Sequence, residues 1–269
     1  MTDWQASGVI TITTDFGHKG PFAAVMKGVI LSRYRAATVV DLAHDIPAHW
    51  PPEAGFWISR SYQYFPPGTV HVAIVDPGVG TEREIILASK DGHIFMAPDN
   101  GLLAPLLEDA DQVCKLDNEV LPKLGIETPS LTFHGRDIFA PLAAEFAAGR
   151  INLNDVGIEI SDWTPGWLEE PEVTNDSVHG IVVTVDAFGN LISNIDQSLI
   201  KDFKQPVVSL AGHKFEMKPT YGRAKPGDYL ALINSFGVVE IARAEGSAAD
   251  GLGSDRGAPV VITDKVNGD

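Results

Sequence analysis

Apolar and polar residues alternate along the first half of the chain with two different periods. Short, β-branched apolar stretches predict strands, and they occur at residues 9–14, 38–42, 69–75, 84–89, 93–97 and 111–116. Between them, apolar residues at helical spacing predict helices at 21–34, 52–65 and 137–149. Pro21 and Pro52 suit a first helical turn, and Asp137 and Gly149 suit the N-cap and the end of the last helix.

Strands that alternate with helices predict an α/β domain with a mostly parallel sheet flanked by helices. In such sheets, ligands bind beyond the carboxyl ends of the strands. Asp15 follows the strand at 9–14, and Asp76 follows the strand at 69–75. We therefore expect both carboxylates at the ligand-binding edge.

The pattern changes after residue 150. Residues 151–178 are rich in turn formers and acids, which predicts a linker between domains. Short β segments then follow without a comparable helix, at 180–186, 207–210, 229–234, 238–244 and 259–264. The chain is thus expected to comprise an α/β domain at 1–150, a linker at 151–178 and an all-β, barrel-like domain at 179–269.

The net charge of the chain indicates which classes of binding partner are unfavourable. The 269 residues include 36 acids and 20 Lys and Arg, for a formal net charge of −16, which argues against nucleic acid or an anionic membrane. No apolar tract is long enough to cross a bilayer, and the first residues do not resemble a secretory signal. The single cysteine, Cys114, fits a reducing compartment, so a cytoplasmic protein is expected.

Asp76, Arg83 and His134 are the best candidates for chemistry. They lie in two Gly-rich segments, VDPGVGTER (75–83) and FHGRDIF (133–139). Each alone has a simpler interpretation: a turn, a surface charge and a loop histidine. Together, a carboxylate held by a cation and a nearby imidazole can bind, orient and polarise a water molecule.

Two segments could be taken for cofactor-binding or metal-binding motifs. Gly78-Val79-Gly80 resembles the start of a dinucleotide fingerprint, but Arg83 replaces the third glycine and a strand follows where a helix should begin. A second group could hold a metal ion, which would suggest a metal-dependent phosphohydrolase, although its spacing matches no specific site. This group comprises Asp41, His44, Asp45 and His49.

Several loops allow both a structural and a binding interpretation. Trp50 is either a packing residue or an aromatic wall for a flat or cationic ligand. The run DAFGN (186–190) is either a hairpin turn or a binding loop. The same two interpretations apply to NSFG (234–237). The side chains of residues 246–249 are small enough to let a ligand approach the backbone closely.

The motifs together resemble those of the S-adenosyl-L-methionine hydroxide adenosyltransferases, which are related to the fluorinase and chlorinase. The resemblance covers residues 9–264 and rests on motifs that occur in the family's order: TDFG (14–17), VDPGVGTER, APDNG (97–101), FHGRDIFAP (133–141), DAFGN and NSFG. It implies an N-terminal α/β domain, a C-terminal β-barrel and a homotrimer. It also implies that water attacks C5′ of S-adenosyl-L-methionine at a site shared by neighbouring subunits, with no metal or redox cofactor.

The resemblance also assigns residue roles by matched motif. Asp76, Arg83 and His134 take the places of the water-activating residues. The implied substrate-binding residues are Asp15 for the ribose, Trp50 for the pocket wall, Asp186 and Ser235 for the methionine part, and Phe188, Asn190 and Ala248 for the adenine.

Other functions remain open at this point. The halogenases have Tyr-Pro where this chain has Val75-Asp76-Pro77, and the carboxylate of Asp76 would repel a halide ion while accepting a hydrogen bond from water. A halide adenosyltransferase is therefore the nearest alternative. The others are the metal-dependent phosphohydrolase and a non-catalytic protein that binds S-adenosylmethionine or adenosine.

Overall fold

The computed structural model describes residues 4–265. The chain divides into two compact units, Met1–Trp167 and Leu168–Asp269, here called unit 1 and unit 2. Each unit encloses its own hydrophobic core. No helix within the described residues is long and apolar enough to cross a membrane.

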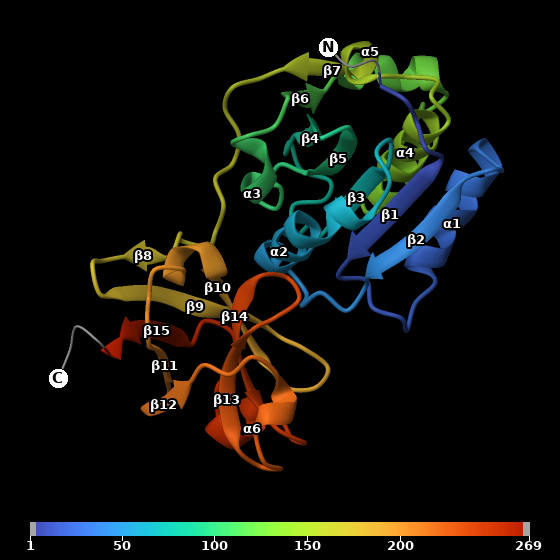
Figure 1. Ribbon diagram of the computed structural model, residues 1–269. Coiled ribbons are helices and arrows are strands. Elements are labelled where there is room, and N and C mark those ends of the chain that lie inside the picture. The colour runs from blue at the N-terminus through green and yellow to red at the C-terminus, as the bar shows by residue number, and fades with distance from the viewer. Residues whose placement is uncertain (1–3, 266–269) are drawn as a thin grey trace. The chain divides into compact units, whose positions relative to one another are not determined.

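Unit 1 is built on a seven-stranded sheet in the order β2-β1-β3-β5-β4-β6-β7 (Figure 1). Its strands are β1 (Val9–Thr14), β2 (Thr38–Ala43), β3 (Val70–Ile74), β4 (Ile85–Lys90), β5 (His93–Pro98), β6 (Gln112–Leu116) and β7 (Gly157–Glu159). The neighbouring strands β2, β1, β3 and β5 pair in parallel. By contrast, β4 pairs antiparallel with β5 and β6, and β6 pairs antiparallel with β7. The sheet is therefore mixed, which corrects the expectation of a mostly parallel one.

The turn between β4 and β5 explains the difference. Asp91 and Gly92 have φ angles of 50° and 75°, as a two-residue hairpin turn of type I′ requires. Such a short turn can join only antiparallel neighbours. Because β5 lies beside β3, the hairpin places β4 on the outer side of β5, where further antiparallel strands add to it.

Helices cover both faces of this sheet (Figure 1). On one face, α1 (Phe22–Arg33) and α4 (Ala140–Ala147) pack against residues such as Ile10 and Val72. On the other face, α2 (Pro51–Ser61) and α3 (Ala104–Leu107) pack against residues such as Ala73 and Phe95. Val72 and Ala73 serve opposite faces because successive strand residues point in opposite directions.

The last predicted helix of unit 1 differs at its start. Gly135–Phe139 form a π-helical turn, and α4 begins only at Ala140. Asp137 is therefore inside the helical turn and is not an N-cap. Gly149 ends the helix as predicted, with a φ of +66° that favours glycine. The helix predicted at 52–65 is likewise shorter, since α2 ends at Ser61 and a 3-10 turn follows.

Unit 2 is an antiparallel sheet in the order β12-β11-β15-β9-β10-β14-β13, with β8 added to β9. Its strands are β8 (Glu172–Val173), β9 (Ser177–Val185), β10 (Leu191–Asp196), β11 (Pro206–Leu210), β12 (His213–Glu216), β13 (Tyr229–Ile233), β14 (Val238–Arg243) and β15 (Pro259–Asp264). A parallel bridge between Met217 and Ala231 joins the two ends of this order, so the sheet nearly closes into a barrel. The short helix α6 (Ala248–Leu252) follows β14.

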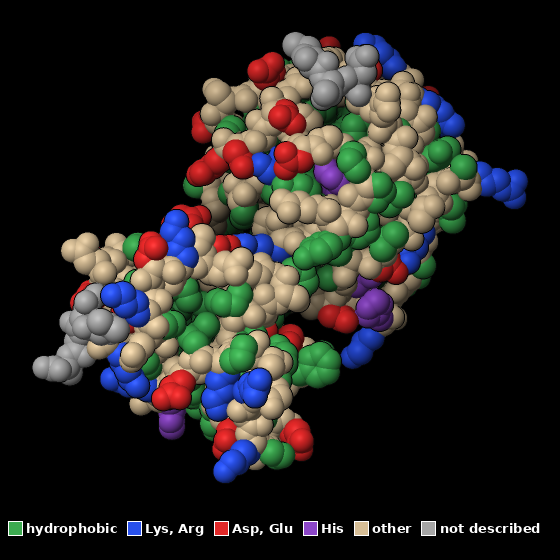
Figure 2. Space-filling view, in the orientation of Figure 1, with side chains coloured by type: hydrophobic (Ala, Val, Ile, Leu, Met, Phe, Trp, Pro, Cys, Tyr) green, Lys and Arg blue, Asp and Glu red, His purple; other side chains and the backbone are tan. Residues whose placement is uncertain are grey.

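The segment 151–178, predicted as a linker, contains regular structure. It begins with α5 (Leu153–Val156), which runs directly into β7 at the edge of the unit 1 sheet. It also contains β8, which pairs with β9 of unit 2, and its last two residues are the first of β9. On the face that Figure 2 shows, acidic and basic side chains are interspersed over both units.

Candidate active site

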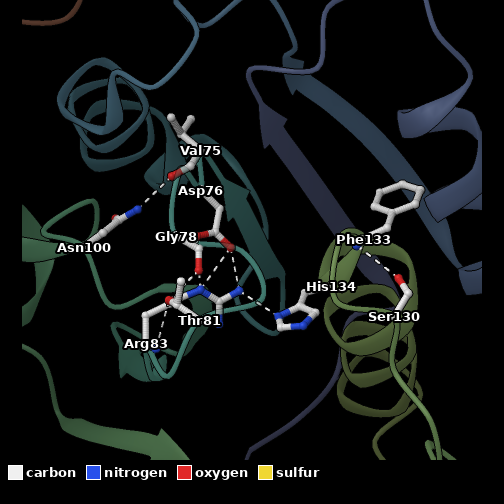
Figure 3. A network of polar contacts seen from close by, with 9 residues as sticks. All are labelled: Val75, Asp76, Gly78, Thr81, Arg83, Asn100, Ser130, Phe133 and His134. Atoms are coloured by element: carbon white, nitrogen blue, oxygen red, sulfur yellow. Dashed lines mark hydrogen bonds and ion pairs between the residues drawn. The ribbon is translucent and has the colours of Figure 1, made fainter.

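The first part of the candidate site is the loop that follows β3. The side-chain amide of Asn100 donates to the carbonyl oxygen of Val75 at 2.8 Å, which holds the backbone next to Asp76. The chain then turns, because the amide and the hydroxyl of Thr81 both donate to the carbonyl oxygen of Gly78, at 3.1 and 2.7 Å. This turn brings Arg83 back over Asp76 just before β4 begins (Figure 3).

Arg83 and Asp76 form a two-pronged ion pair. Nε of Arg83 lies 3.1 and 3.0 Å from the two carboxylate oxygens of Asp76, and Nη2 lies 2.5 Å from Oδ2. The two side chains are only 11% and 5% exposed. A buried carboxylate is costly unless a cation and hydrogen bonds compensate it, and the fork of Arg83 supplies both.

His134 is the third member of the group. Nη2 of Arg83 lies 2.9 Å from Nδ1 of the His134 ring (Figure 3). A guanidinium group can only donate hydrogen bonds, so Nδ1 must be the acceptor and carry no proton. The neutral ring then has its proton on Nε2. Burial, and after it the positive charge of Arg83, lower the pKa of His134, which favours this neutral form.

His134 stands directly before the π-helical turn, close to the end of β3. At Gly135, a Cβ atom would lie 3.1 Å from the sulfur of Met26 and 3.2 Å from Cδ1 of Ile74. Both contacts are tighter than ordinary packing allows. Glycine therefore lets the start of this helix lie against the strand whose end carries Asp76, and this close packing brings the three residues together.

Asp15 lies at the same edge of the sheet. Thr14 is opposite Ile74 in the parallel pair of β1 and β3, and Asp15 and Asp76 follow these strands. One oxygen of Asp15 accepts a hydrogen bond from the backbone amide of His49 at 3.1 Å. The expectation that both carboxylates lie beyond neighbouring strand ends is confirmed.

Trp50 immediately precedes α2 and is partly buried. Its ring lies edge to face with Trp167, with 6.5 Å between the centroids. The indole nitrogen Nε1 is buried and has no hydrogen-bond partner within residues 4–265. A buried donor without an acceptor is unusual, and it marks a place where a ligand could supply one.

The residues considered for a metal site bond to one another and to their neighbours. Asp41 accepts hydrogen bonds from Lys27 at 2.5 Å and is paired with Nε2 of His44 at 2.8 Å. The other ring nitrogen of His44 bonds to the hydroxyl of Thr14, also at 2.8 Å. Within residues 4–265, no group of three or more His, Cys, Asp or Glu side chains is arranged to hold a metal ion.

In unit 2, the run 186–190 forms a tight turn between β9 and β10. The carboxylate of Asp186 accepts hydrogen bonds from the amides of Phe188 and Asn190, both at 2.9 Å, and from the side chain of Asn190 at 3.0 Å. Phe188 is 79% exposed, whereas Asn190 is buried. The structural interpretation as a hairpin turn is confirmed, and it leaves an exposed aromatic ring at the tip.

The segment around Ala248 packs on this turn. The amides of Ala248 and Ala249 both donate to the carbonyl oxygen of Gly189 at 3.0 Å. A Cβ atom at Gly189 would lie 2.2 Å from Oγ of Ser247, so the approach requires glycine. The three residues that the resemblance assigns to adenine, Phe188, Asn190 and Ala248, therefore come from two segments that lie together. Ser235 lies in the separate turn between β13 and β14.

One buried acid in unit 2 was not selected from the sequence. Glu240 is 3% exposed and accepts hydrogen bonds from Tyr221 at 2.6 Å and Asn234 at 3.2 Å. Burial raises the pKa of Glu240, and so does the negative charge of Asp186. A single acid in the otherwise apolar run VVEIA (238–242) was the available signal.

Comparisons with known proteins agree over most of the chain. The family models for the N-terminal and C-terminal domains of SAM hydroxide adenosyltransferases match residues 10–157 and 180–261. A Thermus thermophilus protein named (R)-S-adenosyl-L-methionine hydrolase is 35% identical, over 92% of this chain and 96% of its own. A fluorinase from Actinopolyspora mzabensis is 25% identical, over 98% and 99%. The crystal structure of an uncharacterised conserved protein from Thermotoga maritima, 33% identical, superposes with a TM-score of 0.86 and covers 94% of this chain and 99% of that one.

Proposed function

Because the chain belongs to the SAM hydroxide adenosyltransferase family, we propose that it hydrolyses S-adenosyl-L-methionine to adenosine and L-methionine. The observation that carries this proposal is the group formed by Asp76, Arg83 and His134, in which one guanidinium contacts both a carboxylate and an imidazole. Such a group can hold a water molecule, whereas it offers a halide ion an unfavourable negative charge.

In the proposed reaction, the oxygen of a water molecule attacks C5′ as the C5′–S bond breaks. The bonding electrons remain on sulfur, so methionine leaves as a neutral thioether and requires no general acid. The water's proton passes to Asp76 and from there to solvent. The protein's main contribution is to hold the water in line with the breaking bond.

The protonation state of the His134 ring determines which group accepts the proton of the attacking water. Its Nδ1 accepts from Arg83, and its Nε2 carries a proton, so the neutral ring has no free acceptor for the water's proton. We assign His134 the role of a donor that orients the water oxygen and Asp76 the role of the proton acceptor. Arg83 fixes both partners with one planar group.

We propose that Asp15 binds the ribose hydroxyls and that Trp50 forms a wall of the pocket. The remaining acceptor capacity of Asp15 and the unpartnered Nε1 of Trp50 support these roles. In unit 2, Phe188, Asn190 and Ala248 would hold adenine, while Asp186 and Ser235 would hold the methionine part. A carboxylate has about four acceptor positions, and the turn occupies three of those of Asp186, leaving about one for an ammonium group.

Isotope labelling tests the reaction. S-Adenosylmethionine is incubated with the protein in ¹⁸O-water, and adenosine is analysed by mass spectrometry. We expect the label at O5′, because the new C5′–O bond takes its oxygen from water. Each sulfonium epimer should be supplied separately, since the curated relative is named for the (R) form. Absence of adenosine, or adenosine without the label, would reject the hydrolase.

A halide adenosyltransferase is the second candidate, because the chain is also similar to a fluorinase. Adding chloride or fluoride to the same assay should leave the rate and product unchanged if Asp76 excludes halide. Formation of 5′-halo-5′-deoxyadenosine would assign the chain to the halogenases. Tight binding without any product would instead indicate a sensor.

We further propose a homotrimer whose subunits share each substrate site, as the family resemblance implies. Light scattering measures the subunit number directly. Sharing is tested by coexpressing Asp76→Ala with Asp186→Ala. If each site takes Asp76 and Asp186 from different subunits, mixed trimers recover part of the activity that each variant lacks alone. A monomer, or no recovery in isolated mixed trimers, would refute the shared site.

A further inference from the structure

We propose that Asp137 is a positioning residue for the reaction, which holds the segment that presents His134 to Arg83. The proposal rests on the proposed function, since it assigns Asp137 a role in the same site. Asp137 itself contacts neither Asp76 nor Arg83 through a hydrogen bond, so it would act through the backbone that carries His134.

Three links enclose His134 between residues 130 and 137. Oδ2 of Asp137 accepts a hydrogen bond from the amide of Ser130 at 2.8 Å. Oγ of Ser130 in turn accepts from the amide of Phe133 at 3.1 Å (Figure 3). The carbonyl oxygen of Phe133 accepts from the amides of Arg136 and Asp137, both at 3.1 Å. The carboxylate thus connects the beginning of the segment to the helical turn at its end.

Arg136 holds the carboxylate from the other side. Its Nε lies 2.6 Å from Oδ1 of Asp137, and its Nη2 lies 2.9 Å from Oδ2. The same guanidinium lies over the ring of Phe133, 5.3 Å from the centroid. The hydrogen bonds from Arg136, followed by those from Ser130, lower the pKa of Asp137 to about 2. The carboxylate is therefore ionised at neutral pH, as an acceptor of these hydrogen bonds must be.

The π-helical turn explains why such links are needed. A helix that begins with a wider turn makes fewer regular backbone hydrogen bonds there, and π-turns occur often at functional sites. The core contacts of this region come from Ile138 and Phe139 in the turn and from α4 residues such as Leu142 and Phe146, all outside the segment 130–134. The helix body can stay packed when the links are lost, while the imidazole of His134 loses its orientation.

Asp137 also acts on His134 through charge. Its carboxylate raises the pKa of His134, as does that of Asp76, while burial and Arg83 lower it. These are the charged groups that bear on the ring. Removing the charge of Asp137 should therefore lower the pKa of His134 further, which gives a readout that simple loss of stability would not produce.

The test compares Asp137→Asn with a matched control, Asp155→Asn. Asp155 also accepts a backbone amide hydrogen bond within a short segment of unit 1, from Asn152 at 2.8 Å, but in α5. We expect Asp137→Asn to lower kcat roughly 10- to 100-fold with KM changed less than about twofold, as misplacement of a catalytic group does. The control should keep kcat near the wild-type value.

The second measurement follows the His134 ring by NMR, with the signal assigned from a His134→Gln variant. In Asp137→Asn the pKa of His134 should fall relative to wild type, and it should be unchanged in Asp155→Asn. Should Asp137→Asn fold poorly, Ser130→Ala removes only the link to Phe133 and should give a smaller loss of kcat in the same direction.

The outcomes distinguish failure of the positioning role of Asp137 from failure of the proposed hydrolase function. Unchanged kcat and an unchanged His134 signal in Asp137→Asn overturn the positioning role, as does a loss of kcat in equal measure in the control. If the wild-type protein releases no labelled adenosine, the proposed function fails. The NMR comparison still decides then whether Asp137 holds His134.

Discussion

The two units compensate the negative charge of their carboxylates in opposite ways. In unit 1, Asp76 is compensated by the forked side chain of Arg83, and His134 completes the group. In unit 2, Asp186 is satisfied by the amides of its own turn, and Glu240 by Tyr221 and Asn234. Within the described residues, neither Asp186 nor Glu240 has a Lys, Arg or His ion-pair partner.

The two kinds of hydrogen-bond partner suit different roles, proton transfer in unit 1 and ligand binding in unit 2. A carboxylate held by a forked cation is fixed in direction, as a proton acceptor must be. Carboxylates held by amides and hydroxyls shape a loop and leave a negative region suited to a cation. We infer that unit 1 carries the chemistry and that unit 2 contributes recognition.

The largest expected effect is on turnover in unit 1. Asp76→Asn keeps the size of the side chain but removes its ability to take a proton. We expect kcat to fall roughly 10²- to 10⁴-fold, the usual contribution of a general base. Adenosine release in single-turnover experiments is the measurement. Wild-type turnover in this variant would end the role of Asp76 and the contrast between the units.

Arg83→Met tests whether Arg83 stabilises the fold by compensating the buried charge of Asp76. It leaves Asp76 buried and unpaired, which should lower the free energy of unfolding by about 3 to 5 kcal/mol. Urea unfolding measures the loss. The double variant Asp76→Asn with Arg83→Met should recover most of the stability but none of the activity. If the double variant is no more stable than Arg83→Met, the ion pair does not compensate the buried charge.

Acid should weaken unit 1 through His71. This residue is 1% exposed and bonds to Thr11 and His93 within the sheet. Burial, and after it His93, lower the pKa of His71 from 6.5 to about 3. Below pH 6.5 the unfolded chain binds a proton that the folded one does not, so stability falls as pH falls from 6.5 towards 3.

At pH 4.5 this loss is on the order of 3 kcal/mol. Stability measured between pH 7 and 4.5 should therefore fall less steeply in His71→Asn than in wild type. His213→Asn, at an exposed site in unit 2, serves as the control and should keep the wild-type slope. Equal slopes for wild type and His71→Asn would show that His71 is not the group responsible.

The smallest effect on stability is expected at the tip of the unit 2 turn. Phe188 is 79% exposed, so Phe188→Ala should change the free energy of unfolding by less than about 0.5 kcal/mol. If the exposed ring stacks on adenine, KM should rise while kcat stays close to wild type. An unchanged KM would remove Phe188 from the recognition surface.

The local pattern anticipated most strands of both units, because a β-branched run bounded by turn residues has few alternatives. The positions of Asp15 and Asp76 at strand ends also followed from this pattern. The mixed sheet did not, because pairing partners distant in the sequence decide the order of strands. Asp137 was misread as a cap because a π-helical turn has no distinct local signal.

The motifs, their order and the residue types available for chemistry are readable along the chain, since they depend only on neighbouring residues. How these residues act depends on the packed fold. It placed one guanidinium against both Asp76 and His134, and thereby identified which ring nitrogen of His134 accepts and which group is left to take a proton. The contact between Arg83 and His134 joins residues 51 positions apart, and hydrogen-bond geometry at that separation exists only after the sheet and its helices have packed.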